Sequence, residues 1–455
     1  MNFSTDDFGD NFRWGVSTAA HQIEGAAFSD GKGPSIWDEF VKRKGKIQDR
    51  SRSDVSCDHY GRYKEDIGLI GQLHIPNYRM SLSWSRLLPN GIGQRNQKGI
   101  DFYHRVIDEC LEKNIEPWIT LYHWDLPQAL QAKGGWVNRE ILNWFEEYVT
   151  LCARQYGDRV KHWMVLNEPM VFTGAGYFLG YHAPGLKGLD NFLPAMHHAA
   201  LCQSLGGRVV RSEVVAAKIG STFSCSHIDP KSDSQKDVQT ATRFDALLNR
   251  LFLEPALGLG YPLDDLPIAS RVEKYMAQGD ESRMAFDFDF IGIQNYTREV
   301  VKHTWYIPYL QGEIVGAKSR GVATTTMGWE VYPKSIYNLL HKFNKYENVK
   351  EIVITENGAA FPDQIADGRV RDQLRINFLN SYVGEVLNAK KEGVNVTGYF
   401  LWTLLDNFEW AEGYTQRFGI VHVDFKTLRR TIKDSGYWYS RFLMSPKHAE
   451  RIDIL

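Results

Sequence analysis

The 455-residue sequence has few cysteines and no long apolar run. Its five cysteines are scattered and odd in number, which favours reduced thiols over a disulfide framework. No apolar run reaches about 18 residues, so no membrane-spanning helix is predicted. Residues 1–12 lack the basic and apolar regions of a signal peptide. These absences predict a cytoplasmic protein without a membrane partner.

The sequence also lacks a charge excess and the common metal and phosphate motifs. Its net charge is −2, which gives no electrostatic basis for binding nucleic acid or an anionic membrane. No Cys/His spacing suggests a metal site and no glycine-rich loop suggests bound phosphate, so no cofactor is expected. No repeat or linker-like segment divides the chain, so residues 1–455 are expected to form one domain. The pattern leaves the oligomeric state open.

Aromatic residues are plentiful, at 13% of the chain, with 13 tryptophans and 22 tyrosines. Most are expected in the core. The hydrophobic content of 43% is ample to form such a core. Because aromatic faces stack on the C–H faces of sugars, a tryptophan-rich site would suit a small carbohydrate substrate.

Two short apolar runs end in the same way. Residues 351–358, EIVITENG, read as a buried parallel strand that ends in Glu356, Asn357 and a glycine. Residues 163–169, WMVLNEP, have the same construction and end in Asn167 and Glu168. In α/β folds, ligands bind where the carboxyl ends of the strands meet. Two carboxyl groups at one such site are the minimum set of catalytic groups for glycoside hydrolysis. One attacks the anomeric carbon and the other protonates the leaving oxygen.

Apolar strands alternate with helical patterns along the whole chain. Helices are expected near 58–73, 97–114, 138–156 (with Asn138 as N-cap), 190–211, 234–251, 333–346, 371–391 and 434–443, with a long loop over 302–332. Strands are expected at 12–20, 75–84, 116–124, 162–169, 214–223, 290–297, 351–358 and from 397. Eight such units predict a single (β/α)8 TIM barrel with long βα loops, although periodicity alone leaves a doubly wound sheet open.

Polar and aromatic residues at the strand ends favour the closed barrel. They belong to seven different strands, which only a closed ring would bring to one point: Gln22, Arg79, His123, Asn167, Glu168, Tyr296, Glu356 and Trp402.

With these residues in view, the chain resembles glycoside hydrolase family 1, the β-glucosidases and their relatives. The resemblance covers nearly the whole chain, and its segments are FRWGVSTAAHQIEG at 12–25, LNEP at 166–169, ITENG at 354–358 and LLDNFEWAEGYTQRFG at 404–419. It implies a retaining exo-β-glycosidase without a cofactor or metal. It also implies a cis peptide between Trp402 and Thr403.

The resemblance further implies a role for each site residue. Glu356 would be the nucleophile and Glu168 the general acid/base. Arg79 and Tyr296 would hold the nucleophile, with Asn295 nearby. The terminal sugar would be bound by the remaining positions: Gln22, His123, Asn167, Glu409 and Trp410 at its hydroxyls, Trp402 beneath it, Trp124 and Phe418 at its border, and Trp329 on the leaving-group side.

Three functions remain open from the sequence. The first is a β-glucosidase acting on neutral β-glucosides and cello-oligosaccharides, with galactosides and fucosides as further substrates because Gln22 and Glu409 accept either epimer at O4. The second is a 6-phospho-β-glucosidase, which the anionic run Glu409–Glu412 disfavours. The third is a non-catalytic sugar-binding barrel, which the presence of both carboxylates disfavours.

Overall fold

The computed structural model describes residues 3–444, and eight parallel strands form a closed barrel within them. Around the ring, the strands follow the order β1-β13-β10-β7-β5-β4-β3-β2. Their bounds are β1 Arg13–Ser17, β2 Asn77–Ser81, β3 Glu116–Tyr122, β4 His162–Asn167, β5 Lys218–Ser224, β7 Phe290–Gln294, β10 Ile352–Asn357 and β13 Val396–Trp402. The (β/α)8 fold class expected from the sequence is confirmed, and the doubly wound alternative is wrong.

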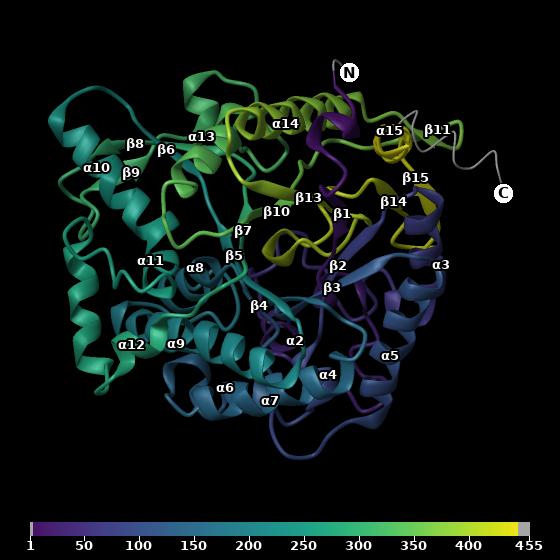
Figure 1. Cartoon of the computed structure of the whole chain (residues 1–455), viewed down its shortest axis with the longest axis horizontal. Helices are drawn as coiled ribbons and strands as arrows, with labels where there is room; N and C mark the ends of the chain where they lie inside the picture. Colours follow the sequence, from purple (N-terminus) through teal and green to yellow (C-terminus); the bar gives the residue numbers. More distant parts are fainter. Residues whose placement is uncertain (1–2, 445–455) are drawn as a thin grey trace.

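Helices surround the strands on the outside (Figure 1). The long ones are α3 His59–Gln72, α5 Gln97–Glu112, α7 Ile141–Tyr156, α9 Leu189–Glu213, α10 Gln235–Asp245, α13 Lys334–Phe343, α14 Gln373–Lys391 and α15 Asp434–Leu443. They are amphipathic: α5, for example, buries Ile100, Tyr103, Val106 and Ile107 on one face. Among residues 3–444, no helix combines the length and apolarity needed to cross a bilayer. All five cysteines are buried free thiols.

The barrel interior is packed with side chains. Five of them, each from a different strand, form a separate buried cluster: Trp118, Met164, Phe290, Val353 and Phe400. The Met164 sulfur lies 3.3 Å from Nε of Arg79 on β2. Large interior side chains therefore form a solid layer against which a charged group at the mouth of the barrel can rest.

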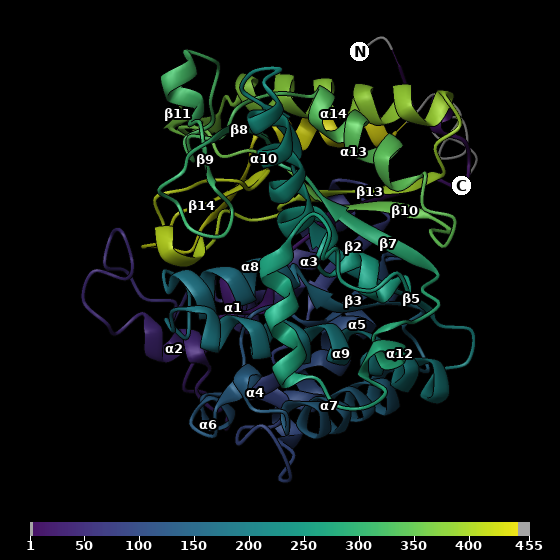
Figure 2. The same ribbon diagram turned by 90° about the vertical axis from the view of Figure 1, so that its left-hand side faces the viewer.

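Short elements follow the carboxyl ends of the strands. They include α1 Ala20–Ile23 after β1, α8 Pro169–Thr173 after β4, β9 Gly312–Ile314 after β7 and β14 Val421–Val423 after β13. Figure 2 shows these elements on one side of the molecule, to the left in that view, together with α2 Ile36–Phe40. This is the end of a (β/α)8 barrel at which active sites are built.

Several expected boundaries are wrong. The strand expected at 214–223 begins only at Lys218, because α9 continues to Glu213 and Val215 is 98% exposed. Asn138 is not the N-cap of α7: its side chain accepts a hydrogen bond from the backbone N–H of Glu140 in the turn before the helix. The helix expected to reach 251 gives way to a π-helical turn after Asp245.

The region expected as a long loop over 302–332 also holds regular structure. A three-stranded sheet consists of β6 His227–Pro230, β8 Arg298–His303 and β9 Gly312–Ile314. Strand β8 pairs in parallel with β6 and antiparallel with β9. The outer end of the barrel mouth therefore has a rigid wall on the side of β5 and β7.

The loop after β13 is held by a buried group of charges. The Lys433 ammonium, before α15, contacts Asp363 and lies 2.6 Å from Asp406. Asp406 also accepts hydrogen bonds from the backbone N–H of Gly419 at 3.0 Å and from Arg417 at 2.7 Å. Both ends of the segment 406–419 are thereby fixed to the barrel.

We predict that Lys433→Met lowers the free energy of unfolding by about 3–5 kcal/mol, because Asp363 and Asp406 would keep buried charges without their shared cation. Urea denaturation followed by tryptophan fluorescence measures this change. Lys98→Met, which breaks an ion pair with Asp30 at the surface, is the matched control and should have a much smaller effect. Equal losses in the two variants would contradict a stabilising role for the buried group.

Candidate active site

A cavity of about 520 Å³ opens at the carboxyl ends of the barrel strands. It brings together most of the residues expected at the site. Its lining includes His123, Trp124, Glu168, Tyr296, Trp329, Glu356, Trp402, Glu409, Trp410 and Phe418. Arg79, Asn167 and Gln22 are buried behind this lining and reach it through hydrogen bonds.

Glu356 is the single acidic residue of β10 and is buried with three hydrogen-bond donors around its carboxylate. Arg79 forms an ion pair with Oε1, which also accepts a hydrogen bond from Gln294 at 2.8 Å. The Tyr296 hydroxyl donates to Oε2 at 2.6 Å. Each donor favours the ionised carboxylate, which is the form that a nucleophile requires.

The strand that carries Glu356 ends where the backbone comes close to β13. A Cβ on Gly358 would lie 1.8 Å from the carbonyl oxygen of Trp402, so only glycine fits there. The Trp402–Thr403 peptide is cis, as the resemblance implied.

Glu168 differs from Glu356 in its partners. It follows β4 directly, and its backbone N–H donates to the carbonyl of Thr222 on β5 at 2.9 Å. The Ser224 hydroxyl lowers the pKa of the Glu168 side chain, which has no ion pair in the described part of the chain. The two carboxyl groups at this site therefore have contrasting surroundings.

The pKa values of the two carboxyl groups follow from these surroundings. Burial raises the pKa of Glu168 well above its usual value, and the charge of Glu356 raises it further. Burial also raises the pKa of Glu356, but the charge of Arg79 and the hydrogen bond from Tyr296 oppose it. Glu356 is thus the carboxyl that ionises first, and Glu168 keeps its proton. Burial is the larger of the two causes that raise the pKa of Glu168, and the like charge of Glu356 is the smaller.

Three polar side chains form a chain of hydrogen bonds beside the carboxylates. Asn167 accepts from Arg79 at 2.5 Å and donates to Nε2 of His123 at 2.9 Å. His123 Nδ1 therefore carries the proton, and burial lowers the pKa of this imidazole well below its usual value. Within residues 3–444, neither His123 Nδ1 nor Gln22 Oε1 has a hydrogen-bond partner, although both are buried. A donor and an acceptor left free in this way suit sugar hydroxyls.

Gln22 is held by the loop after β13. Its amide Nε2 donates to the Asn407 side chain at 3.0 Å, to the carbonyl of Phe408 at 3.1 Å and to Glu409 Oε2 at 3.1 Å. The segment 406–419, which Lys433 and Asp406 fix to the barrel, therefore brings Glu409 to Gln22. The residues that follow the first and last barrel strands thus form one hydrogen-bonded group.

Aromatic rings form the walls of the cavity. Trp410 lies 4.5 Å from Trp124, measured between ring centroids, and it stacks on His123 at 5.9 Å. On the other side, Trp329 and Phe418 lie 5.3 Å and 6.1 Å from Tyr296. These rings give apolar faces around a polar centre, which is the composition of a sugar-binding cavity.

Asn295 lies near the nucleophile as expected, because its backbone N–H donates to the Glu356 carbonyl at 3.1 Å, but its side chain does not hold the carboxylate. Its side-chain amide donates to the carbonyls of Cys225 and Thr297 and to the Ser335 hydroxyl, so it turns away from Glu356. Gln294 takes the expected place beside the nucleophile. Side chains alternate along a strand, so Gln294 and Tyr296 point to the same side and Asn295 to the other. That alternation was the signal that sequence reasoning missed.

Three residues of the cavity are held in the left-handed backbone region. The φ angles are +77° for Trp124, +47° for Glu168 and +47° for Trp410. Non-glycine residues rarely adopt such angles, which cluster at functional sites where the surroundings enforce them. No motif in the sequence predicted this.

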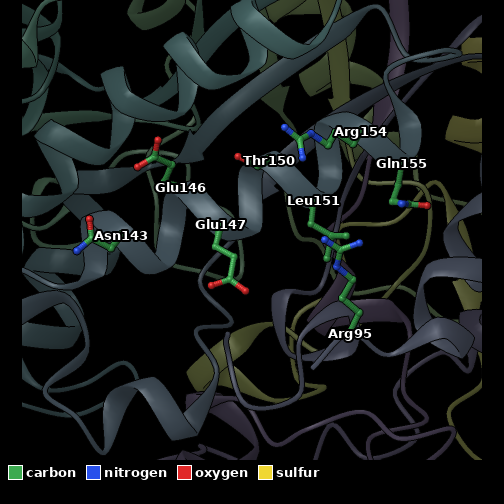
Figure 3. A pocket seen from close by; sticks show the side chains of 8 residues that line it. All are labelled: Arg95, Asn143, Glu146, Glu147, Thr150, Leu151, Arg154 and Gln155. Atoms are coloured by element: carbon green, nitrogen blue, oxygen red, sulfur yellow. The ribbon is translucent and has the colours of Figure 1, made fainter. Parts of the chain in front are cut away.

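A separate pocket of about 450 Å³ lies on the outer surface of α7 (Figure 3). Its lining comes from α7 and the loop before α5: Arg95, Asn143, Glu146, Glu147, Thr150, Leu151, Arg154 and Gln155. Glu147 accepts a hydrogen bond from the backbone N–H of Gly93 at 2.7 Å. The pocket shares no lining residue with the cavity at the barrel mouth, so it plays no part in this site.

Comparison with known proteins gives a consistent result. Residues 4–447 match the family model of glycosyl hydrolase family 1. Beta-glucosidase A of Thermotoga maritima is 45% identical over 436 residues, which cover 95% of this chain and 97% of the relative. Beta-glucosidase A of Acetivibrio thermocellus is 43% identical over 96% of this chain and 98% of the relative. The structure of a beta-glucosidase from Thermotoga maritima in complex with deoxynojirimycin has a TM-score of 0.93 and 44% identity, covering 96% of this chain and 98% of that chain. The chain therefore belongs to glycosyl hydrolase family 1.

Proposed function

We propose that this protein is a retaining exo-β-glucosidase that removes terminal β-D-glucosyl residues from β-glucosides and cello-oligosaccharides. The observation that carries the proposal is the contrast between its two cavity carboxyl groups. Glu356 has an ion pair with Arg79 and a hydrogen bond from Tyr296, whereas Glu168 lies in the same cavity without an ion pair among the described residues. One group is thereby prepared as a nucleophile and the other as an acid.

The reaction proceeds in two displacements. In the first, the Glu356 carboxylate bonds to the anomeric carbon while the bond to the leaving oxygen breaks and Glu168 gives that oxygen its proton. In the second, Glu168 accepts a proton from water, whose oxygen attacks the anomeric carbon and releases Glu356. Two inversions at one carbon give net retention.

Sugar recognition falls to the buried polar groups at the inner end of the cavity. Gln22, His123, Asn167 and Glu409 would bind the hydroxyls, with Trp402 beneath the ring and Trp410 at its edge. Gln22 and Glu409 are linked directly, and both suit either epimer at O4. Galactosides and fucosides are therefore included as further substrates of the proposed enzyme.

The charge of the cavity disfavours a 6-phosphorylated sugar. Among residues 3–444, five glutamates line it and no lysine or arginine does: Glu168, Glu299, Glu356, Glu409 and Glu412. Burial raises the pKa of Glu409 to about 8, so the expected repulsion by its charge is weak at neutral pH. The case against a phosphate instead rests on the lack of a cation in the lining, because a buried phosphate needs one.

Two further expectations complete the proposal. The whole chain, residues 1–455, would act as one catalytic unit, because strands from its start to its end contribute to the cavity. The buried free cysteines agree with a reducing, cytoplasmic location.

Hydrolysis of 4-nitrophenyl β-D-glucoside followed by proton NMR tests the proposal as a whole. We expect β-glucose to form first and then to mutarotate, because both displacements invert the anomeric carbon. A panel with galactoside, fucoside, cellobiose and 6-phosphoglucoside ranks the substrates in the same assay. First-formed α-glucose would exclude retention, and a preference for the 6-phosphate would contradict the argument from the missing cation.

Replacing each carboxylate separates their roles. Glu168→Ala should form the glycosyl-enzyme readily from a 2,4-dinitrophenyl glucoside, whose leaving group needs no proton, and then stall by ~10²–10⁴-fold for lack of a base. Azide, which needs no base, should restore turnover and give a β-glucosyl azide.

Glu356→Ala is the matched control. It should lose nearly all activity with every leaving group, and azide should give the α-glucosyl azide by direct attack on the substrate. If Glu168→Ala lost equal, small amounts of activity on cellobiose and on the dinitrophenyl glucoside, its assignment as the acid/base would be wrong.

Glu409 should make stability depend on pH. Its pKa is raised from 4.5 to about 8 in the folded protein, so the folded state holds a proton that the unfolded chain has released between these values. Stability must then fall as the pH rises from about 4.5 to about 8. Glu409→Gln should remove this part of the decline. The free energy of unfolding of the variant minus that of the wild type should therefore be larger at pH 8 than at pH 5. Urea denaturation at the two pH values measures the difference, and parallel pH dependence in both proteins would refute it.

A further inference from the structure

Glu299 lines the cavity but has no part in the chemistry described above. It lies on β8, three residues after Tyr296, in the small sheet that extends beyond the end of barrel strand β7. Its cavity neighbours include Ser226, Leu248, Thr297 and Ile314. These residues follow β5 and β7 along the chain, so this wall belongs to the outer half of the cavity.

The outer half is where a leaving group must lie. The inner end holds the buried groups around Asn167 and His123, and the acid Glu168 must reach the oxygen that joins the sugar to the leaving group. The cavity wall formed by β8 and its neighbours therefore faces the leaving group. Glu299 is an acidic side chain of this wall.

Glu299 stands apart from its charged neighbours because its side chain has no ion-pair partner among the described residues. Arg298, beside it, forms ion pairs with Asp229 at 2.8 Å and Glu330 at 2.9 Å. Arg320 pairs with Glu330 at 2.5 Å. In the described part of the chain, the Glu299 side chain makes no hydrogen bond or ion pair, although its backbone pairs with β6. Burial raises the pKa of Glu299 to about 7, and the charge of Arg320 only partly opposes this rise because it makes no ion pair with Glu299.

We propose that Glu299 selects the leaving group by its charge. Its carboxylate would oppose anionic leaving groups and favour cationic ones, while neutral ones, such as the sugars of cello-oligosaccharides, would bind without this effect. The proposal rests on the proposed function, because it concerns the leaving group of that reaction. Glu299 would act through its field on the bound substrate, as a specificity-determining residue outside the bond-breaking step.

Three aryl β-glucosides that differ in one substituent test this. The substituents at the 4-position of the phenyl ring are carboxylate, carboxamide and aminomethyl, which carry charges of −1, 0 and +1. Assays at pH 8 keep Glu299 ionised, since its pKa is about 7. Each substrate is compared between wild type and Glu299→Gln, so its intrinsic reactivity cancels.

We expect Glu299→Gln to raise kcat/KM for the carboxylate on the order of tenfold relative to the carboxamide, and to lower it for the aminomethyl compound to a similar degree. Glu313→Gln is the matched control. Glu313 lies in the same sheet and the substitution changes the net charge equally, but Glu313 pairs with Lys302 and does not line the cavity.

Equal shifts for all three substrates, or the same pattern in Glu313→Gln, would overturn the proposal. Glu299→Ala removes the same charge and replaces Glu299→Gln if the latter does not fold. Failure of the proposed function would look different, because the wild type would then hydrolyse none of the three glucosides.

Discussion

The buried ion pair between Arg79 and Glu356 is the interaction on which the site depends. A guanidinium in the barrel interior is costly unless a carboxylate compensates for it, and a carboxylate there would otherwise bind a proton. Each group therefore requires the other, with Gln294 and Tyr296 supplying further hydrogen bonds. Because Asn167 accepts from the same guanidinium, the nucleophile and the sugar-binding groups share one fixed reference point.

Closure of the barrel is what allows this pair to form. Arg79 comes from β2 and Glu356 from β10, which are separated along the chain by 277 residues and stand on different parts of the ring. The packed layer around Met164 supports them from below. The loop after β13, fixed through Asp406 and Lys433, completes the ring from the other side. The geometry of the site is therefore a property of the whole barrel rather than of any one segment.

The sequence predicted the features that have a strong local pattern. Apolar strands that end in Asn-Glu located Glu168 and Glu356, and the lone arginine of an apolar strand located Arg79. Features set by tertiary packing were missed. The sheet that carries Glu299 has short strands with a weak sequence pattern, and no residue type marks the left-handed backbone at Glu168. The boundary of β5 failed because β-branched Val214 and Val215 favour a strand by propensity, yet Val214 is the buried C-cap of α9 and Val215 points into solvent.

The same ion pair also controls the second half of the proposed reaction. In the free enzyme, burial and the charge of Glu356 both hold the proton on Glu168. Once Glu356 is esterified by the sugar, its charge is gone while Arg79 remains cationic beside it. One cause of the raised pKa of Glu168 then disappears, and the attraction of Arg79 for the ionised form is no longer offset by the nucleophile. The pKa of Glu168 must fall at that moment, so the residue that gave a proton in the first step can accept one from water in the second.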